Sequence, residues 1–314
     1  MKAVRFHEYG DPEVLRYEDV DLPVPRAGQV RVHVAATTFN GVDGNIRAGF
    51  MQDPMPLTLP HIPGLDVAGT VDALGEGVGG LEIGDRIVGF LPFVDDGAAA
   101  EYVLAPAGIL AAAPTSIPLA DAAALPLVGL TAWQALFDQA ELKAGQRILI
   151  SGAGGAVGGY AVQLAKAAGA YVIATGSPRS IERVKAAGAD EVIDHTTTEV
   201  TTAVTEPVAV LLNLAPIDPA EFTALAGLVR DGGVVVSTTV WMPAPADEER
   251  GVRGIDLFVR SDAGQLSELV ARVDRGALTV DVAERVALAD LASVHARAAA
   301  GTLPGKVVVL PATA

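Results

Sequence analysis

The 314-residue sequence contains no cysteine. Disulfide bonds, thiolate zinc sites and a cysteine nucleophile are therefore excluded together. Histidine is also scarce: there are five, and no two stand three or four positions apart, the spacing that puts two ligands on one face of a helix. We therefore expect no metal site.

Basic residues are few. The chain has 22 Lys and Arg against 38 Asp and Glu, a formal net charge of −16. Nucleic-acid binding depends on Lys and Arg patches that neutralise phosphates, so this balance disfavours a nucleic-acid partner. We expect the acidic surface to be solvated and to aid solubility.

Signals for export or membrane insertion are missing from the printed sequence. The segment MKAVRFHEYG lacks the basic-then-apolar order of a signal peptide, and there is no uninterrupted run of about eighteen apolar residues. We therefore expect a cytoplasmic protein without a membrane segment.

The length and the 50% hydrophobic content suit about two domains with buried cores. Residues 1–118 read as short strands and turns; VRVHVAAT, for example, alternates on a two-residue period. In residues 119–264 the runs RILIS, YVIAT, VAVLLNL and GVVVSTTV alternate with Ala-rich helical segments. This alternation of strands and helices predicts an α/β fold with a parallel sheet, whose strands are joined by right-handed crossover connections.

A glycine-rich turn follows the first of these strands. Ala153, Gly155 and Gly158 form an A-x-G-x-x-G pattern that also includes Gly154, Ala156 and Val157. Small residues there allow a tight turn, close approach of a pyrophosphate, and close packing of a helix whose N-terminal amides face the anion. Because a strand precedes the loop and a helix follows it, we predict a dinucleotide site rather than an unrelated glycine-rich turn.

The end of the next strand has no carboxylate. An NAD site usually places Asp or Glu there for the ribose 2′-hydroxyl, whereas this chain reads Thr175, Gly176, Ser177, Pro178, Arg179. Ser177 and Arg179 can bind a 2′-phosphate that a carboxylate would repel, so we predict NADPH. The alternative is that Arg179 is an ordinary surface residue.

By these stretches the chain resembles the zinc-free quinone oxidoreductases of the medium-chain dehydrogenase/reductase superfamily. The likeness covers nearly the whole length and rests on HIPGLDVAGTVDALGEGVGGLEIGDRIVG, GLTAW, GQRILISGAGGAVGGYAVQLAK and the terminal GKVVVL. One mild departure is Gly155-Ala156, where the family signature usually has two adjacent glycines.

The resemblance implies a Rossmann NADPH-binding domain, residues 119–264, inserted into a GroES-like β-barrel catalytic domain formed by residues 1–118 and 265–314. It also implies a homodimer in which the last strands of the inserted domain, around 234–239 and 255–259, extend a sheet into the partner. Sheet edges left unpaired in a monomer give that arrangement a physical motive.

Zinc-dependent relatives hold catalytic zinc with a Cys near Asn40 and a histidine in a Gly-His-Glu stretch. Here the corresponding segments are FNGVD and Gly64-Leu65-Asp66, and the cysteine-rich structural-zinc lobe is missing. Alcohol oxidation that needs a Lewis acid is therefore not expected. The resemblance implies metal-free hydride transfer from NADPH to a quinone or an enone.

By the same resemblance, Asn40 and Asp43 are the candidate catalytic residues beside the nicotinamide, with Thr131 near the cofactor. Each has a structural alternative: Asp43 can cap a helix, and Thr131 can bond its own helix backbone. Many family members carry a tyrosine two residues after the aspartate, but this chain has Asn45. A quinone needs a positioned acid less than an enoyl thioester does, which favours the quinone.

Further cofactor contacts are expected at the carboxyl ends of later strands. His195 is a candidate for stacking near the adenine, and Lys306 is placed near the cleft by resemblance or, alternatively, at a strand edge. A lone loop histidine, His61, is taken as solvated rather than substrate-binding. The strand-end candidates are Asn213, Leu214, Thr238, Thr239 and Phe258.

Two other functions remain open from the sequence. One is NADPH-dependent reduction of α,β-unsaturated carbonyls, whether alkenal, enone or enoyl thioester. The other is NADPH binding without turnover, which the missing tyrosine encourages.

Overall fold

The computed structural model describes residues 1–239 and 241–311. The chain divides into two compact units, one made of residues 1–127 and 261–314 and the other of residues 128–260. The division after Leu127 falls within helix α3 (Pro126–Trp133). The sequence had suggested boundaries at residues 118 and 264.

The first unit is β-rich and is built from both ends of the chain. Its main sheet has the strand order β14-β15-β3-β4-β5-β7, with β6 also paired to β3, and β1 pairs with β2 in a separate ladder. The C-terminal strand β15 is antiparallel to β3, so the two ends of the chain share one sheet. The strands are β1 (Lys2–Phe6), β2 (Leu15–Asp19), β3 (Gln29–Thr38), β4 (Asp66–Leu74), β5 (Arg86–Phe90), β6 (Tyr102–Pro106), β7 (Leu110–Ala112), β14 (Glu284–Ala287) and β15 (Val307–Leu310).

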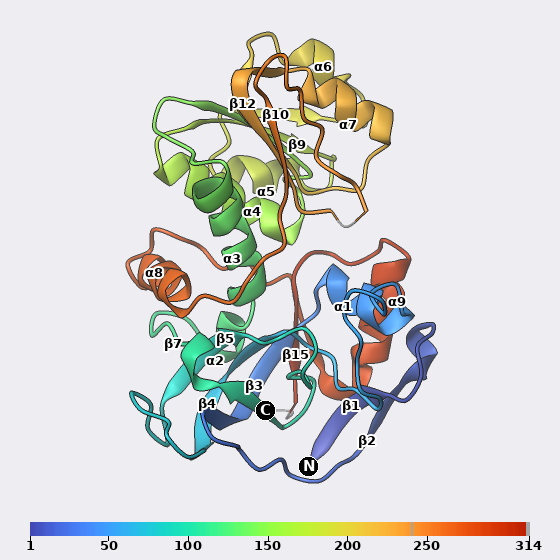
Figure 1. Cartoon of the computed structure of the whole chain (residues 1–314), viewed down its shortest axis with the longest axis vertical. Coiled ribbons are helices and arrows are strands. Elements are labelled where there is room, and N and C mark those ends of the chain that lie inside the picture. The colour runs from blue at the N-terminus through green and yellow to red at the C-terminus, as the bar shows by residue number, and fades with distance from the viewer. Residues whose placement is uncertain (240, 312–314) are drawn as a thin grey trace. The chain divides into compact units, whose positions relative to one another are not determined.

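The alternation expected for VRVHVAAT is present in β3. Val30, Val32 and Val34 are buried in the core of this unit, and His33 between them is exposed. Helix α1 follows β3 and lies beside α9, from the other end of the chain (Figure 1). The helices of this unit are α1 (Gly41–Ala48), α2 (Leu119–Ala122), α8 (Ala263–Asp274) and α9 (Leu291–Ala299).

The second unit is a six-stranded parallel sheet with the order β10-β9-β8-β11-β12-β13. In chain order this is 3-2-1-4-5-6, the arrangement of dinucleotide-binding Rossmann domains, and it confirms the α/β prediction. The strands are β8 (Arg147–Ser151), β9 (Tyr171–Gly176), β10 (Glu191–Asp194), β11 (Val208–Asn213), β12 (Val229–Ser237) and β13 (Arg253–Asp256). The helices are α4 (Ala156–Ala167), α5 (Ile181–Ala186), α6 (Val200–Ala203) and α7 (Pro219–Ala226), and a π-helical turn spans Gln134–Gln139.

The strands of this unit form a continuous apolar layer because both faces of the sheet are covered. All six residues of β11 are buried, and Leu149, Ile173, Leu211 and Val235 of four neighbouring strands share one core cluster. Such continuous burial is typical of parallel sheets, whose crossover helices cover the two faces. The order reverses between β8 and β11, which marks the place where ligands bind in such sheets.

One helical stretch passes a test for membrane spans. Residues Leu119–Gln139 have a mean hydropathy of 1.3 over a window that is 83% buried. Asp121 and Asp138 interrupt this stretch, so it contains no uninterrupted run of about eighteen apolar residues. A mostly buried helix of this kind is weak evidence for a span, since a core helix passes the same test.

Candidate functional site

The phosphate-type loop lies where the sequence pattern placed it, between β8 and α4. Gly155 is the N-cap of α4 in extended backbone (φ −82°, ψ 176°), and Ala156, Val157 and Gly158 form the first turn of the helix. The first N–H groups of a helix have no acceptor within it, so they are available to an anion. Two hydrogen bonds hold the loop in place. Gly155 N–H donates to Gly152 O at 3.1 Å, and Gly152 N–H donates to Thr175 Oγ1 at 2.9 Å.

The glycines of this loop differ in whether the surrounding chain leaves room for a side chain. A Cβ on Gly158 would lie 2.3 Å from Ala153 O and 2.5 Å from Ala153 Cα, so the helix approaches the strand end too closely for any side chain. A Cβ on Gly155 would meet only Gly152 O, at 3.5 Å. Gly155 is exposed, so nothing in the chain itself requires a glycine there. Its role in the approach of a pyrophosphate stays a prediction.

The end of β9 and the start of α5 are bound to this loop. Ser180 Oγ accepts from Ser177 N–H at 3.0 Å, and a Cβ on Gly154 would lie 2.4 Å from the same oxygen. Arg183 Nη2 donates to Gly154 O at 2.6 Å. The guanidinium of Arg183 and the hydroxyl of Ser180 therefore lie beside the loop. Arg179, the predicted phosphate ligand, is exposed.

Other predicted cofactor residues lie along the same carboxyl edge of the parallel sheet. Asn213 ends β11 and is buried; its Nδ2 donates to Ala215 O at 3.0 Å, and its Oδ1 has no hydrogen-bond partner in the described chain. The backbone N–H groups of Leu214 and Thr238 bond to Ser151 O and Asn213 O, which ties the loops after β8, β11 and β12 together. Thr239 follows, half-buried, and its N–H donates to Ser237 Oγ at 3.3 Å.

The remaining candidates of this unit are more dispersed. His195 directly follows β10, is exposed, and donates its backbone N–H to Gly176 O at 3.2 Å. Phe258 lies two residues beyond β13 and is 60% exposed. Thr131 is buried in α3. Their roles toward a cofactor stay predictions.

The other unit holds Asn40, Asp43 and Lys306. Asn40 is the N-cap of α1, and its backbone N–H donates to Asp43 Oδ2 at 2.8 Å. Asp43 Oδ1 accepts from Gly64 N–H at 3.2 Å. Asp43 therefore caps the helix, as its structural alternative proposed, and joins the loop before β4 to α1. It is buried, and a catalytic role for it stays a prediction.

Burial raises the pKa of Asp43 to about 7, with a further rise from the nearby carboxylate of Asp66. The backbone donors of Asn40 and Gly64 and the ammonium of Lys306 act against that rise because they favour the ionised form. A carboxyl group with a pKa in this range changes its protonation near neutral pH.

Asp66 is the centre of a buried polar cluster that also contains Thr38, Asn40 and Lys306. Its Oδ2 accepts from Thr38 Oγ1, from Asn40 Nδ2 at 2.9 Å and from Lys306 Nζ at 3.2 Å. Its Oδ1 accepts from Leu127 N–H at 2.7 Å. The side chains of Lys306 and Asp66 are only 4% and 0% exposed. This is a fully desolvated ion pair, compensated by hydrogen bonds on every side.

Lys306 also reaches Asn40. Its Nζ donates to Asn40 Oδ1 at 2.5 Å and to Phe39 O at 3.4 Å. The structure thus brings together Asn40 and Lys306, which are 266 positions apart in sequence. The structure also adds Asp66 to this group. From the sequence, Asp66 was noted only as the last residue of Gly64-Leu65-Asp66, the segment that corresponds to Gly-His-Glu in zinc-dependent relatives.

Three further residues bear on the predictions made from the sequence. His61 is buried against the ring of Phe6 (centroids 5.5 Å apart) rather than solvated, and burial lowers its pKa. Arg183 was missed because only its contact with the phosphate loop distinguishes it from the other charged residues of α5. Asn45, where many relatives have tyrosine, lies on α1 and is half-buried.

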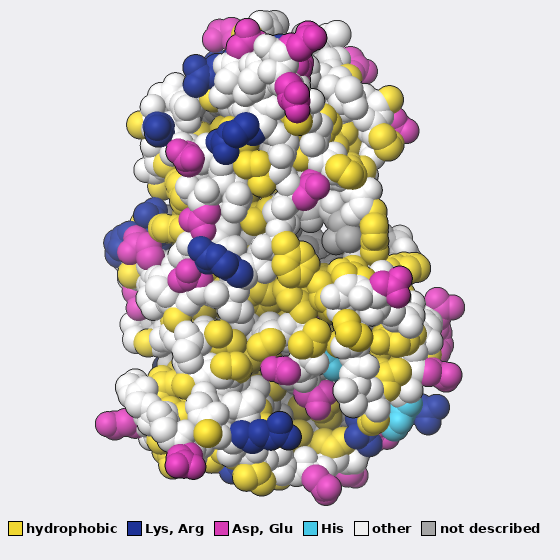
Figure 2. All heavy atoms as spheres, in the orientation of Figure 1, with side chains coloured by type: hydrophobic (Ala, Val, Ile, Leu, Met, Phe, Trp, Pro, Cys, Tyr) yellow, Lys and Arg dark blue, Asp and Glu magenta, His cyan; other side chains and the backbone are white. Residues whose placement is uncertain are grey.

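No group of three or more His, Asp or Glu side chains suited to a metal ion is found within residues 1–239 and 241–311. On the face shown in Figure 2, acidic side chains are scattered with basic ones between them. No large basic patch is visible on that face.

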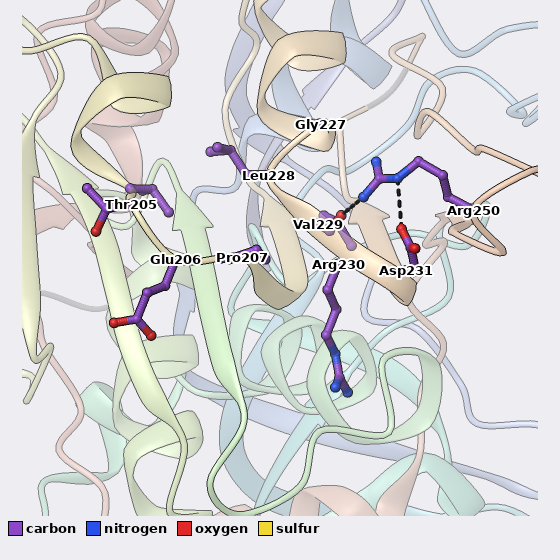
Figure 3. A pocket seen from close by; sticks show the side chains of 10 residues that line it. Thr205, Glu206, Pro207, Gly227, Leu228, Val229, Arg230, Asp231 and Arg250 are labelled. Carbon is purple, nitrogen blue, oxygen red and sulfur yellow. Dashed lines mark hydrogen bonds and ion pairs between the residues drawn. The ribbon is translucent and has the colours of Figure 1, made fainter.

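A cavity of about 500 Å³ lies at the amino ends of β11 and β12, and Figure 3 shows the side chains that line it. It is lined by residues 204–207, which precede β11, by residues 227–231, which lead into and begin β12, and by Arg250. Arg250 is held by Asp231 Oδ1 at 3.0 Å and by Val229 O. Because the cavity is at the amino ends of the strands, it is separate from the dinucleotide candidates.

Known families match both units. A profile described as alcohol dehydrogenase GroES-like domain matches residues 26–115, and one described as zinc-binding dehydrogenase matches residues 187–309. A chloroplastic quinone oxidoreductase of Triphysaria versicolor is 33% identical over 99% of this chain and 98% of its own length. The chain belongs to the quinone oxidoreductase-like medium-chain dehydrogenase/reductase family. This confirms the resemblance inferred from the sequence.

Two other comparisons fit that family. A chloroplast envelope quinone oxidoreductase homologue of Arabidopsis thaliana is 42% identical over 63% of this chain, and the match spans 62% of the relative's length. The structure of the quinone oxidoreductase from Coxiella burnetii superposes with a TM-score of 0.90 at 29% identity and covers 99% of both chains. The fold of a GroES-like domain and a Rossmann sheet is therefore shared across the whole chain.

Proposed function

We propose that this protein is an oxidoreductase of the quinone reductase type that uses NADPH and transfers hydride to a quinone without a metal. The observation that carries the proposal is the small-residue loop at the carboxyl edge of the Rossmann sheet, next to a β9 end without a carboxylate. Membership of the quinone oxidoreductase-like family supports the reaction class.

The backbone of the glycine-rich loop supports the assignment of a dinucleotide to it. The first-turn amides of α4 supply unpaired donors, and the exposed Gly155 leaves its backbone accessible to an anion. Family members use a nicotinamide cofactor, which supplies the hydride when it is bound. What this chain contributes is a rigid donor array, fixed by the bonds of Gly152 to Thr175 and to Gly155.

NADPH is preferred over NADH in this proposal because of the residues after β9. Ser177 and Arg179 follow the strand, and Arg183 lies against the loop through Gly154 O. A guanidinium binds phosphate oxygens strongly, whereas a carboxylate at this point would repel them. We therefore assign the 2′-phosphate to this corner, with Arg183 added to the two residues inferred from the sequence.

Metal-free chemistry is supported by the polar cluster of the first unit. The oxygen atoms of Asn40 and Asp66, at positions related to the zinc-binding segments of relatives, already bond the ammonium of Lys306. A quinone suits such a site because its reduced oxygen is a phenolate that water can protonate, so the absence of tyrosine at Asn45 is tolerated.

We also propose a cytoplasmic homodimer that binds neither nucleic acid nor membrane. The net charge of −16 supports the exclusion of nucleic acid. Strand β13 is the edge of the parallel sheet and pairs only with β12 among the described residues, so it offers a row of backbone groups to a partner. Light scattering after gel filtration tests the dimer, and a monomeric mass would contradict it.

The test of function is NADPH oxidation with 1,4-benzoquinone, a naphthoquinone, a 2-alkenal and crotonyl coenzyme A, with NADH as control. Turnover of quinones with NADPH is expected. Arg183→Ala and Arg179→Ala should raise the KM for NADPH and leave that for NADH unchanged. Turnover of only the alkenal or thioester would contradict the quinone assignment, and tight NADPH binding without any turnover would favour a non-catalytic role.

A further inference from the structure

The carboxamide of Asn40 is held between two groups of opposite character. Lys306 Nζ carries only donors and contacts Asn40 Oδ1 at 2.5 Å. Asp66 Oδ2 is only an acceptor and contacts Asn40 Nδ2 at 2.9 Å. Lys306 and Asp66 also bond one another at 3.2 Å, which closes a ring of three side chains. Rotating the carboxamide by 180° would place an N–H against an ammonium and an oxygen against a carboxylate.

We propose that Asp66 and Lys306 are positioning residues that fix the orientation of the Asn40 carboxamide. Asn40 Nδ2 carries two hydrogens, and its one acceptor within residues 1–239 and 241–311 is Asp66 Oδ2. The second N–H is then the oriented donor to the carbonyl oxygen of the electron acceptor, where negative charge develops on reduction. This inference rests on the proposed function and names how the same site recognises its substrate.

Stability alone is a poor explanation for this ion pair. Both charges are almost completely buried, and removing two charges from water costs free energy that apolar residues of similar volume would not require. The cluster nevertheless satisfies Asp66 with Thr38, Asn40, Lys306 and the Leu127 amide. A buried pair whose two members both hydrogen-bond the carboxamide of Asn40 is placed to fix the orientation of that group.

The orientation can be observed directly by NMR because the chain has only three asparagines, at positions 40, 45 and 213. Selective ¹⁵N-asparagine labelling therefore yields three side-chain amide pairs, and Asn40→Asp identifies the first by its loss. In the natural chain we expect one slowly exchanging Asn40 pair. The variants Asp66→Asn and Asp66→Asn with Lys306→Met contain a fourth labelled pair, from the new asparagine, and Asn40→Asp in the same background identifies the Asn40 pair by its loss. In both variants the Asn40 pair should change chemical shift or split, and its N–H hydrogens should exchange faster with solvent.

The double variant guards against failure to fold. Removing only one partner leaves a buried unpaired charge, whereas removing both leaves none. Asn45 and Asn213 provide internal controls whose signals should not move, since neither contacts Asp66 or Lys306. Asp121→Asn, which breaks the exposed pair with Arg285 in the same unit, is the matched control for loss of a carboxylate.

The kinetic readout separates orientation from folding. Asp66→Asn should lower kcat for quinone by about 10-fold or more and change the Kd for NADPH by less than about twofold. In an Asn40→Ala background the same change should have no further effect on kcat, because the group that it orients is gone. Lys306→Arg should retain more of kcat than Lys306→Met.

An unchanged Asn40 signal in both variants, or equal losses of kcat with and without Asn40, would overturn the inference. If the natural chain oxidises NADPH with quinones while these results are negative, only the inference fails. If none of the acceptors supports NADPH oxidation, the proposed function and the donor role of Asn40 both fail. The NMR result then still decides whether Asp66 and Lys306 orient the carboxamide.

Discussion

The two polar centres of this protein are built in opposite ways. In the Rossmann unit, the candidate anion site consists of backbone N–H groups around residues 152–158, with small side chains that keep space open. In the β-rich unit, the candidate substrate-side cluster consists of charged and amide side chains from the β3–α1 junction, β4 and the residue before β15. The first site is formed by one short segment and depends on its small side chains, which leave the backbone accessible. The second depends on the burial of charged side chains that are far apart in the sequence.

The largest effect is expected from Lys306→Met. It leaves the carboxylate of Asp66 buried without its cation, a change that typically costs about 3–5 kcal/mol of unfolding free energy. The double variant with Asp66→Asn should lose much less. Urea unfolding of both, beside the natural chain, measures the difference. Equal losses in the two variants would show that charge balance does not govern this cluster.

Gly158→Ala comes next and probes the other centre. The new Cβ would lie 2.3 Å from Ala153 O and 2.5 Å from Ala153 Cα, so helix α4 must move from the strand end. Overpacking of this kind costs about 1–3 kcal/mol, and dinucleotide affinity should fall as well. Thermal unfolding and NADPH fluorescence titration test this. Gly159→Ala, whose Cβ meets nothing within 4 Å, is the matched control.

The pH dependence of stability distinguishes the two units further. Because burial raises the pKa of Asp43 to about 7, from a usual value near 3.8, the folded chain keeps a proton that the unfolded chain has lost. The unfolding free energy from this group therefore falls as pH rises between those values, by up to about 1.4 kcal/mol per pH unit. Urea unfolding at pH 5, 6 and 7 should show a shallower slope for Asp43→Asn. If the unfolding free energy falls equally steeply with pH in the natural chain and in Asp43→Asn, the pH dependence comes from the other acidic groups and not from Asp43.

The smallest effect on stability is expected from Gly155→Ala. Its Cβ meets only Gly152 O at 3.5 Å and its φ is −82°, so unfolding free energy should change by no more than about 0.5 kcal/mol. Affinity for NADPH should nevertheless drop by about 10-fold or more, since the added methyl occupies space needed by the pyrophosphate. Unchanged affinity in this variant would remove the loop from the cofactor site.

Much of the Rossmann unit was predictable because its signals are local. The signals all fall within about thirty consecutive residues of one βαβ unit. They are the strands RILIS and YVIAT, the loop after the first strand, and the lack of a carboxylate after the second. Arg183 escaped prediction because its contact with Gly154 O depends on how α5 packs beside the loop. The sequence offers no periodicity that distinguishes it from Glu182 or Lys185.

The polar cluster was predictable only in part. Resemblance drew attention to Asn40, Asp43 and Lys306, but not to their mutual contacts. The buried state of His61 was also missed, since a single histidine in a loop carries no sign of the Phe6 ring that covers it. Local sequence cannot reveal partners that are brought together by sheet register, such as the pairing of β15 with β3.

By itself, the amino-acid sequence determined the class of fold, the place of the glycine-rich loop between β8 and α4, and the exclusion of thiol chemistry, because periodicity, glycine spacing and composition act within short stretches. Tertiary structure alone decided that Asp66, Lys306 and Asn40 form one closed ring, and that Asp43 is buried deeply enough for its pKa to rise. Burial and charge pairing are properties of the folded chain, since desolvation exists only once distant segments have packed together.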